Sequence, residues 1–283
     1  MVELRRLRAE QPDLAPAVDL QLALIELQRR VHPRVPLPAC LPTDATQRLV
    51  PTPGQGLLRF ADLPLDWSDF RRLLHETATL LKRFDAIEAD DYGRLLDVTR
   101  AGATLEPMVR AWYEATSSWG GAEPVGAPRA GGPEGAAGAE AVPEAFGDAF
   151  SLALRPVLQR CAQALMPALD LSAWREARCP LCGGEPELAV FDAAGERALV
   201  CSRCTARWPF ASGACPHCGN GDPARLRSFA SRDRAYRVEA CDACHRYVKA
   251  FDERRGARPV LPPVDTIATL PLDAAAFQHG YRA

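Results

Sequence analysis

Eight of the ten cysteines occur as four Cys-x-x-Cys pairs within a stretch of 66 residues. The pairs begin at Cys179, Cys201, Cys215 and Cys241. Two residues between cysteines allow a tight turn to direct both sulfurs at one ion, while amides of the turn donate hydrogen bonds to the thiolates. Because two such pairs complete a tetrahedral shell of four sulfurs, the pattern predicts two metal sites.

Pairing in chain order defines the predicted ligands. The two sites would be formed by Cys179, Cys182, Cys201 and Cys204, and by Cys215, Cys218, Cys241 and Cys244. Separations of 18 and 22 residues between the pairs are near the 15 to 20 typical of zinc sites. Four cysteines close the coordination shell, so catalysis at the metal is not expected and no catalytic residue is predicted. Spacing alone leaves zinc and iron open, since both accept four sulfurs.

Disulfide exchange is the competing interpretation of a Cys-x-x-Cys pair. Redox motifs of this kind normally occur singly, at the start of a helix in a βαβ unit. The sequence contains four pairs and no such unit. The pattern therefore favours metal binding.

The segments between paired cysteines have the pattern of β-hairpins. In the first unit, residues 188–191 and 198–200 flank the turn DAAGE; in the second, residues 226–229 and 236–240 flank SRDR. A further apolar run follows each closing pair, at 208–210 and 247–251, which indicates a tandem duplication. Units of about 40 residues bury too little surface to fold alone, whereas a structural metal contributes on the order of 10 kcal/mol. Gly183 and Gly219, after the second cysteine of a pair, permit a positive φ.

The N-terminal part has helical periodicity. Apolar residues three or four apart predict helices over 14–31, 67–87, 92–113 and 143–169, the third interrupted near Gly102 or Pro107 and the second capped by Asp66 or Ser68. Residues 33–64 contain seven prolines and predict an extended connection. Residues 117–141 include 17 Gly, Ala or Pro, which is typical of a mobile linker inserted within the helical domain.

The predicted fold is therefore α+β, a helical domain followed by two tandem four-cysteine units of rubredoxin-like or zinc-ribbon-like type. Its expected divisions are 1–172 for the helical domain, 173–212 and 213–260 for the two metal units, and 261–283 for a C-terminal tail. Cys40, Cys161, His32 and His75 have no partner at ligand spacing, so we assign them no function. His217 and His245 lie inside cysteine pairs but outside the ligand positions.

Composition sets the expected compartment. The 283 residues are 47% hydrophobic, which suits a globular core, and the net charge of −2 gives no reason to expect a polyanionic partner. The N-terminus, MVELRRLRAE, lacks the apolar stretch of a signal peptide, and no run of 18 uncharged apolar residues predicts a membrane span. We therefore expect a cytoplasmic protein, where reduced thiols hold metal.

The C-terminal region resembles the formate dehydrogenase accessory protein family, FdhE. The resemblance rests on the four cysteine pairs in order, on EACDACHRYVKAF at 239–251, and on the tail VDTIATLPLDAAAFQHGYRA from 264, where Asp265, Leu270, Leu272, Asp273, Gly280 and Tyr281 match the family pattern. It implies a non-enzymatic maturation factor that binds the catalytic subunit of a respiratory formate dehydrogenase in the cytoplasm, before export or assembly. It also implies two rubredoxin-like iron sites on the same eight cysteines, which favours iron over zinc, and leaves a homodimer open.

Two other functions compete with this interpretation. Zinc ribbons often bind nucleic acid, and residues 201–258 contain 12 Lys or Arg against 6 acids. Over 179–258, however, the excess is only 13 bases against 10 acids, and two tetrathiolate sites with divalent ions, each −2, bring it to −1. Nucleic acid is therefore disfavoured as a partner. Electron transfer at rubredoxin-like iron is the second alternative, and it requires a reversible Fe(III)/Fe(II) couple.

Overall fold

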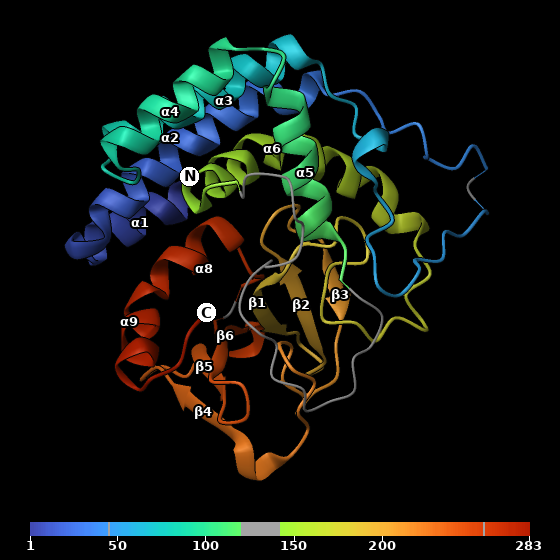
Figure 1. Cartoon of the computed structure of the whole chain (residues 1–283). Coiled ribbons are helices and arrows are strands. Elements are labelled where there is room, and N and C mark those ends of the chain that lie inside the picture. The colour runs from blue at the N-terminus through green and yellow to red at the C-terminus, as the bar shows by residue number, and fades with distance from the viewer. Residues whose placement is uncertain (45, 120–141, 257) are drawn as a thin grey trace.

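The computed structural model describes residues 1–44, 46–119, 142–256 and 258–283. Figure 1 shows a helical layer beside one six-stranded sheet, with the last helices of the chain next to the sheet. The predicted α+β class, an N-terminal helical region followed by two four-cysteine units, is confirmed. Most of the predicted linker, residues 120–141, lies outside the described residues. In the part that is described, no helix is long and apolar enough to cross a membrane.

Six helices of the described residues form the N-terminal layer. They are α1 (Val2–Glu10), α2 (Ala15–Val31), α3 (Trp67–Arg83), α4 (Ala89–Arg100), α5 (Leu105–Ser117) and α6 (Glu144–Leu165). The Asp66 side chain caps α3 by accepting a hydrogen bond from the amide of Asp69 (2.9 Å), as the sequence predicted. α3 ends four residues earlier than predicted, and Asp85 just beyond it has a left-handed φ of 53°. The predicted third helix is interrupted around Gly102 and becomes α4 and α5.

The core of this layer forms around α6. Phe150, Leu154 and Leu158 of α6 are fully buried and belong to one cluster with Leu74 of α3 and Val109 of α5. Their spacing of three or four residues places them on one face of each helix. The apolar periodicity of α6 therefore marks the face that forms the core.

The sheet combines both halves of the duplication. Its strands are β1 (Pro186–Phe191), β2 (Arg197–Cys201), β3 (Arg207–Pro209), β4 (Leu226–Ala230), β5 (Tyr236–Cys241) and β6 (Arg246–Asp252), in the order β3-β2-β1-β6-β5-β4. Within each half the neighbours are antiparallel, as predicted for hairpins. β1 and β6 pair in parallel, with Leu188 opposite Lys249. This parallel pair joins the two units into one sheet.

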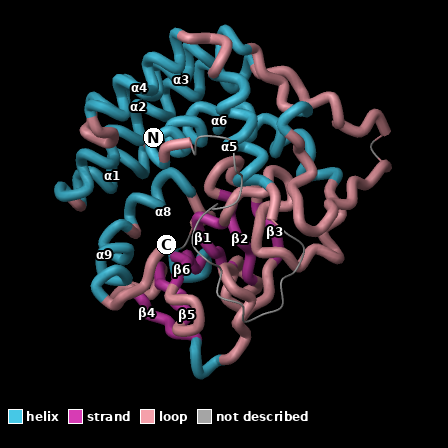
Figure 2. Tube along the Cα trace, in the orientation of Figure 1, coloured by secondary structure: helices cyan, strands magenta, loops and turns pink. Residues whose placement is uncertain are grey.

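One hydrophobic core is shared by the helical layer and the first unit. Leu199 and Trp208, from β2 and β3, belong to the same buried cluster as Leu154 of α6. Figure 2 shows the long loop between α2 and α3 leaving the helices and returning beside the strands. The expected domain boundaries near 172, 212 and 260 stay predictions.

The two ends of the chain also meet. The short helix α7 (Glu253–Gly256) follows β6, and the tail contains α8 (Pro262–Ala268) and α9 (Leu270–Gln278). Leu4 and Leu7 of α1 pack with Val264 and Ile267 of α8 in a separate buried cluster. Neither α1 nor the tail helices were predicted from the sequence. α1 and α8 are short, and they bury their apolar residues against each other.

Candidate metal centres

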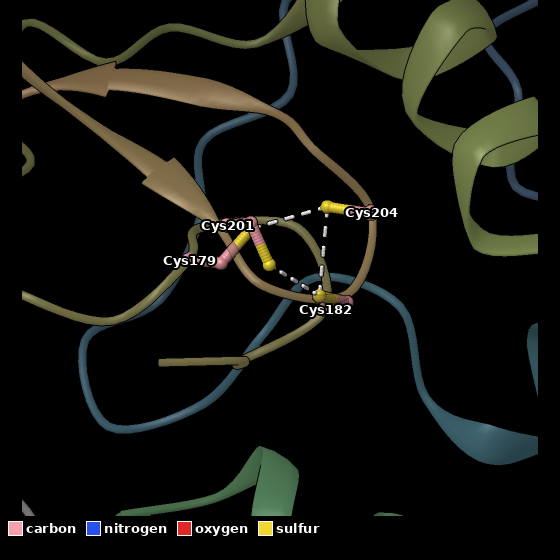
Figure 3. Close-up of side chains that lie close together, drawn as sticks. All are labelled: Cys179, Cys182, Cys201 and Cys204. Atoms are coloured by element: carbon pink, nitrogen blue, oxygen red, sulfur yellow. Dashed lines mark hydrogen bonds between the residues drawn. The ribbon is translucent and has the colours of Figure 1, made fainter. Parts of the chain in front are cut away.

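The first four-cysteine cluster lies at the open end of the β1–β2 hairpin. Pairing of Pro186 with Cys201 brings the turn that contains Cys179 and Cys182 beside the turn that ends in Cys204. The sulfur–sulfur distances are 3.6 Å for Cys179–Cys204, 3.4 Å for Cys182–Cys201 and 3.6 Å for Cys182–Cys204. Figure 3 shows the four side chains converging. Each of the four is at most 1% exposed.

The second cluster repeats this arrangement at the end of the β4–β5 hairpin. Leu226 pairs with Cys241, which brings the two cysteine turns together. The sulfurs of Cys215 and Cys244 are 3.7 Å apart, and those of Cys218 and Cys241 are 3.8 Å apart. Cys218 and Cys244 are partly exposed, whereas the other two are buried. The second cluster therefore lies nearer to solvent than the first.

The structure thus groups the eight predicted ligands as the sequence spacing did. In each cluster the four sulfurs lie within 4.8 Å of one another. Searching the described residues gives these two groups and no other convergence of three or more potential ligands. His217 and His245 stay outside both groups; His217 Nε2 lies instead 2.9 Å from the carbonyl oxygen of Tyr247. Cys161 is buried in α6, where burial raises its pKa to about 12, and Cys40 is half-buried.

All four cysteine turns have the same backbone. The residue after each second cysteine has a positive φ: 70° at Gly183, 58° at Thr205, 72° at Gly219 and 54° at His245. Each of these residues donates its amide to the carbonyl of the first cysteine of the pair, at 2.8 to 3.2 Å. The prediction for the two glycines is confirmed. Thr205 and His245 adopt the same conformation at a cost of roughly 1 kcal/mol or more each, which the duplicated geometry imposes.

The sulfur geometry fits a tetrahedral metal. With metal–sulfur bonds of about 2.3 Å, the edge of a tetrahedron is about 3.8 Å, close to the observed separations. Two turn amides also donate to sulfurs, Arg203 N to Cys201 Sγ and His217 N to Cys215 Sγ, both at 3.4 Å. Such bonds stabilise thiolates and are typical partners of metal-bound cysteines. The donor set suits zinc or iron and does not separate them.

Hydrogen bonds between the thiols favour ionisation of Cys244 and Cys201. A hydrogen bond from Cys215 lowers the pKa of Cys244 to about 5. In the first cluster burial opposes ionisation, but hydrogen bonds from the three other thiols hold the pKa of Cys201 well below its usual value. Burial raises the pKa of Cys179 and Cys204 far above it. Metal binding by Cys179 and Cys204 would therefore displace their protons.

Comparison with known proteins finds similarity to FdhE proteins. Residues 214–283, which contain the second cluster and the tail, match the family model described as "FdhE, C-terminal domain". A "Protein FdhE homolog" from Aquifex aeolicus is 30% identical over 133 residues, 45% of this chain and 46% of the relative. One from Shewanella oneidensis is 36% identical over 109 residues, 37% of this chain and 35% of the relative. The C-terminal region is therefore similar to that of FdhE proteins.

The extent of these matches differs between sequence and fold. The aligned segments span less than half the length of the two FdhE homologs. The crystal structure of the FdhE protein from Pseudomonas aeruginosa matches over 99% of this chain and 90% of that chain, with a TM-score of 0.58 and 19% identity. At that identity the match shows a shared fold. The helical layer and the sheet are therefore both part of the FdhE fold.

In this FdhE fold the first cluster is covered by the proline-rich segment. The amides of Leu57 and Leu58 donate to the carbonyls of Pro180 and Leu181, at 2.9 and 2.8 Å. A Cβ added at Gly56 would lie 2.6 Å from the nitrogen of Gly183. The chain here therefore needs glycine because two backbones touch. Residues 33–64 were predicted only as a connection. The backbone contact of this segment with the first cysteine turn was not predicted.

Arginines surround the first cluster. Arg155 Nη2 donates to the carbonyl of Ser202 (2.8 Å), and Arg203 Nη1 donates to Ser117 Oγ (3.2 Å) while its guanidinium stacks 4.7 Å above the ring of Trp112. Four thiolates around a divalent ion carry a charge of −2, and a buried charge needs a nearby opposite charge. The buried Arg203 and the partly buried Arg155 would supply that compensation. Neither an arginine in a helical pattern, such as Arg155, nor one in a cysteine turn, such as Arg203, carries a sequence signal of this role.

The second cluster is covered by the C-terminal tail. The amide of Arg282 donates to the carbonyl of His245 (2.9 Å), and the amide of Tyr247 donates to the carbonyl of Arg282 (3.0 Å). Tyr281 Oη donates to Asp242, which lies between two cluster cysteines, at 2.5 Å. The last residues of the chain therefore extend the sheet beside the fourth cysteine turn.

Two aspartates hold the tail helices on the sheet. Asp265 of α8 is fully buried and accepts hydrogen bonds from Tyr236 Oη (2.7 Å) and from the guanidinium of Arg258. Asp273 of α9 accepts from Tyr247 Oη (2.6 Å) and Lys249 Nζ (2.8 Å). The two aspartates are among the tail residues on which the family resemblance was based. Their function is to dock α8 and α9 onto β5 and β6.

Proposed function

We propose that this chain is a non-enzymatic accessory factor for the maturation of a respiratory formate dehydrogenase. In this proposal it binds the catalytic subunit of that enzyme in the cytoplasm, before export or assembly. The observation that carries it is the combination of two closed four-cysteine clusters with the match of residues 214–283 to the FdhE C-terminal domain. A closed shell leaves no coordination position for a substrate, so the metals would organise a binding protein.

The proposal assigns one metal ion to each cluster and favours iron. The ligands of the first would be Cys179, Cys182, Cys201 and Cys204, and those of the second Cys215, Cys218, Cys241 and Cys244. The sulfur separations and the amide donors support a tetrahedral ion at each position. Metal analysis of protein purified without oxygen would distinguish the ions, because iron gives thiolate-to-iron absorption and zinc gives a colourless protein.

Co-purification tests the proposed partner. The tagged full-length chain, metal-replete and under reducing conditions, is expected to retain the catalytic subunit of the formate dehydrogenase from the same cells. Cys218→Ser removes a ligand of the second cluster and is expected to weaken the complex, whereas Cys40→Ser, at an isolated half-buried cysteine, should bind as the wild type does. Absence of any complex with the wild-type chain would contradict the proposal.

A cell-based measurement tests the accessory role separately. Deleting the gene should abolish formate oxidation while the catalytic subunit is still synthesised, and the wild-type chain should restore it. Formate oxidation by the purified chain alone would contradict the non-enzymatic assignment.

A further inference from the structure

The strand β4 forms one edge of the sheet, and its outer side is unpaired in the described residues. Figure 1 shows β4 at the outer margin of the molecule, beside α9. None of its five residues is buried. The opposite edge strand, β3, has three residues and ends in Pro209, two features that protect an edge from pairing. β4 contains no proline, and its register with β5 has no bulge, so it lacks such protection.

Hydrogen bonds at the two ends of the β4–β5 ladder fix which groups of β4 point outward. The amide of Asp242 donates to the carbonyl of Arg225, and the amide of Ser231 donates to the carbonyl of Tyr236, each at 2.8 Å. In an antiparallel ladder, bonded pairs alternate with non-bonded pairs. Ser228 therefore directs both its N–H and its C=O away from β5, and so does Ala230. The outward N–H and C=O groups of Ser228 and Ala230 are therefore available for hydrogen bonds with an added strand.

The chain around this edge is positively charged. Arg225, Arg232 and Arg234 are exposed, and none forms an ion pair with a carboxylate in the described part of the chain. Arg227 on the strand itself is paired with Asp242 at 2.9 Å. Exposed guanidinium groups without carboxylate partners attract acidic segments.

The two acids nearest in sequence are already engaged. Asp222 accepts a hydrogen bond from the amide of Ala224. Asp233 accepts from Ser231 Oγ and from the amide of Ala235, and the hydrogen bond from Ser231 lowers its pKa. Both carboxylates therefore stabilise turns and leave the arginines without partners.

Each face of the sheet offers a contact for side chains beside β4. On one face Phe229, 45% exposed, stacks on the ring of His279 with a centroid distance of 5.7 Å. On the other, a cavity of about 130 Å³ is lined by Leu226, Ser228 and Arg197, among others. Arg197 is 4% exposed, and its Nε has no hydrogen-bond partner in the described residues. The cavity therefore offers space beside β4 for a side chain of an added strand.

We infer that the edge of β4, from Arg225 to Arg234, binds an extended acidic segment of a partner protein by strand addition. Backbone hydrogen bonds to Ser228 and Ala230 provide the pairing, the arginines select acidic side chains, and alternate residues contact the aromatic pair and the cavity. The inference rests on the proposed function only for the identity of the partner, because the recognition chemistry is that of this edge.

A second copy of the chain is a poor occupant of the same edge. Antiparallel pairing of β4 with itself would place the arginines of both copies against one another. Like charges across an interface disfavour association. The charge at this edge therefore complements an acidic segment and opposes self-pairing.

A peptide probe tests the edge without the natural partner. The probe is a labelled nine-residue peptide of alternating threonine and glutamate, measured by fluorescence anisotropy against the full-length chain. Ser228→Pro removes the outward amide and obstructs pairing while sparing the bonds to β5, so it should weaken binding by about tenfold or more. Ser228→Ala keeps the amide and should bind as the wild type does. Ala230→Pro gives an independent second variant.

Charge is tested with matched variants. Arg225→Glu, Arg232→Glu and Arg234→Glu should each weaken the probe, and a lysine version of the peptide should not bind. Arg5→Glu and Arg29→Glu, exposed on α1 and α2, serve as controls and should have no effect. Metal content and circular dichroism establish that each variant is folded. Absence of probe binding, equal binding by Ser228→Pro, or wild-type dimers that Ser228→Pro dissociates would each overturn the inference.

A second arm connects the edge to the proposed function. The catalytic subunit of formate dehydrogenase replaces the peptide in the same series. Loss of subunit binding in Ser228→Pro, with Ser228→Ala unaffected, would support the edge as the contact, and equal binding would overturn that assignment while the proposed function stands. A wild-type chain that binds no subunit would contradict the proposed function, and the peptide result would still decide the edge.

Discussion

The two four-cysteine clusters have the same cysteine turns and different surroundings. Each is built from two turns with a positive φ and the same amide-to-carbonyl bond. The first is at most 1% exposed, lies against residues 56–58, and has Arg155 and Arg203 beside it. The second leaves Cys218 and Cys244 partly exposed and is covered by the tail.

The two clusters therefore share their local structure and differ in the segments that they connect. The local turn and hairpin are duplicated, so they bring four sulfurs together in both units. The first cluster also joins the helical layer to the sheet, because its cysteines belong to the shared hydrophobic core. The second holds together β4, β5 and the tail. Loss of a metal should therefore have different consequences in the two units.

The largest expected effect comes from removing one ligand of each cluster in turn. Cys182→Ser should prevent folding, because a structural metal contributes on the order of 10 kcal/mol, comparable to the whole stability of a domain. Cys218→Ser should lose one metal and disorder the second unit while the helical layer still unfolds cooperatively. Soluble yield, metal content and thermal unfolding by circular dichroism measure both. A soluble, folded Cys182→Ser protein with one metal would contradict the comparison.

The rate of metal removal by a chelator should also differ between the two clusters. A chelator should take one metal quickly and the other at least about tenfold more slowly, because sites that open by small fluctuations exchange faster than sites in the core. The fast metal should be the one missing from Cys218→Ser. Release of both metals at one rate would show that the surroundings do not distinguish the clusters.

The tail contacts should control the second cluster alone. Asp265→Asn leaves Arg258 without its buried carboxylate partner and should destabilise the protein by about 3 kcal/mol. It should also speed release of the fast metal and leave the slow one unchanged. Asp97→Asn, in an exposed pair with Arg100, is the matched control and should change neither quantity. Denaturant unfolding and chelator kinetics measure the two effects, and faster release of the slow metal would argue against a tail specific to the second cluster.

The smallest effect concerns the backbone contact at the first cluster. Gly56→Ala would place a Cβ 2.6 Å from the nitrogen of Gly183 and 2.8 Å from the carbonyl oxygen of Leu181, and should destabilise the protein by roughly 1–3 kcal/mol. Gly93→Ala, in the middle of α4 with open space around it, should stabilise the protein by about 0.5–1 kcal/mol. Equal stability of the two variants would mean that residues 56–58 do not seat the first cluster.

Sequence patterns predicted the structures that form between residues close together in the chain. Cysteine spacing predicted which four sulfurs meet, because a turn and a hairpin bring them together within 30 residues. Apolar spacing predicted α2, α3 and α6, and Asp66 predicted the start of α3. The helix ends were less accurate: α6 ends at Leu165, four residues before the prediction, where a 3-10 turn follows.

What the sequence by itself determined is therefore the chemistry of the clusters and the type of each main element. Tertiary structure alone decided the parallel pairing of β1 with β6, the seating of the first cluster on residues 56–58, and the docking of the tail on the second. These contacts join segments far apart in the chain through backbone groups, single glycines and isolated aspartates. Such contacts have no period and no fixed spacing, so only the folded chain reveals that two clusters with the same turns differ in exposure and in what they stabilise.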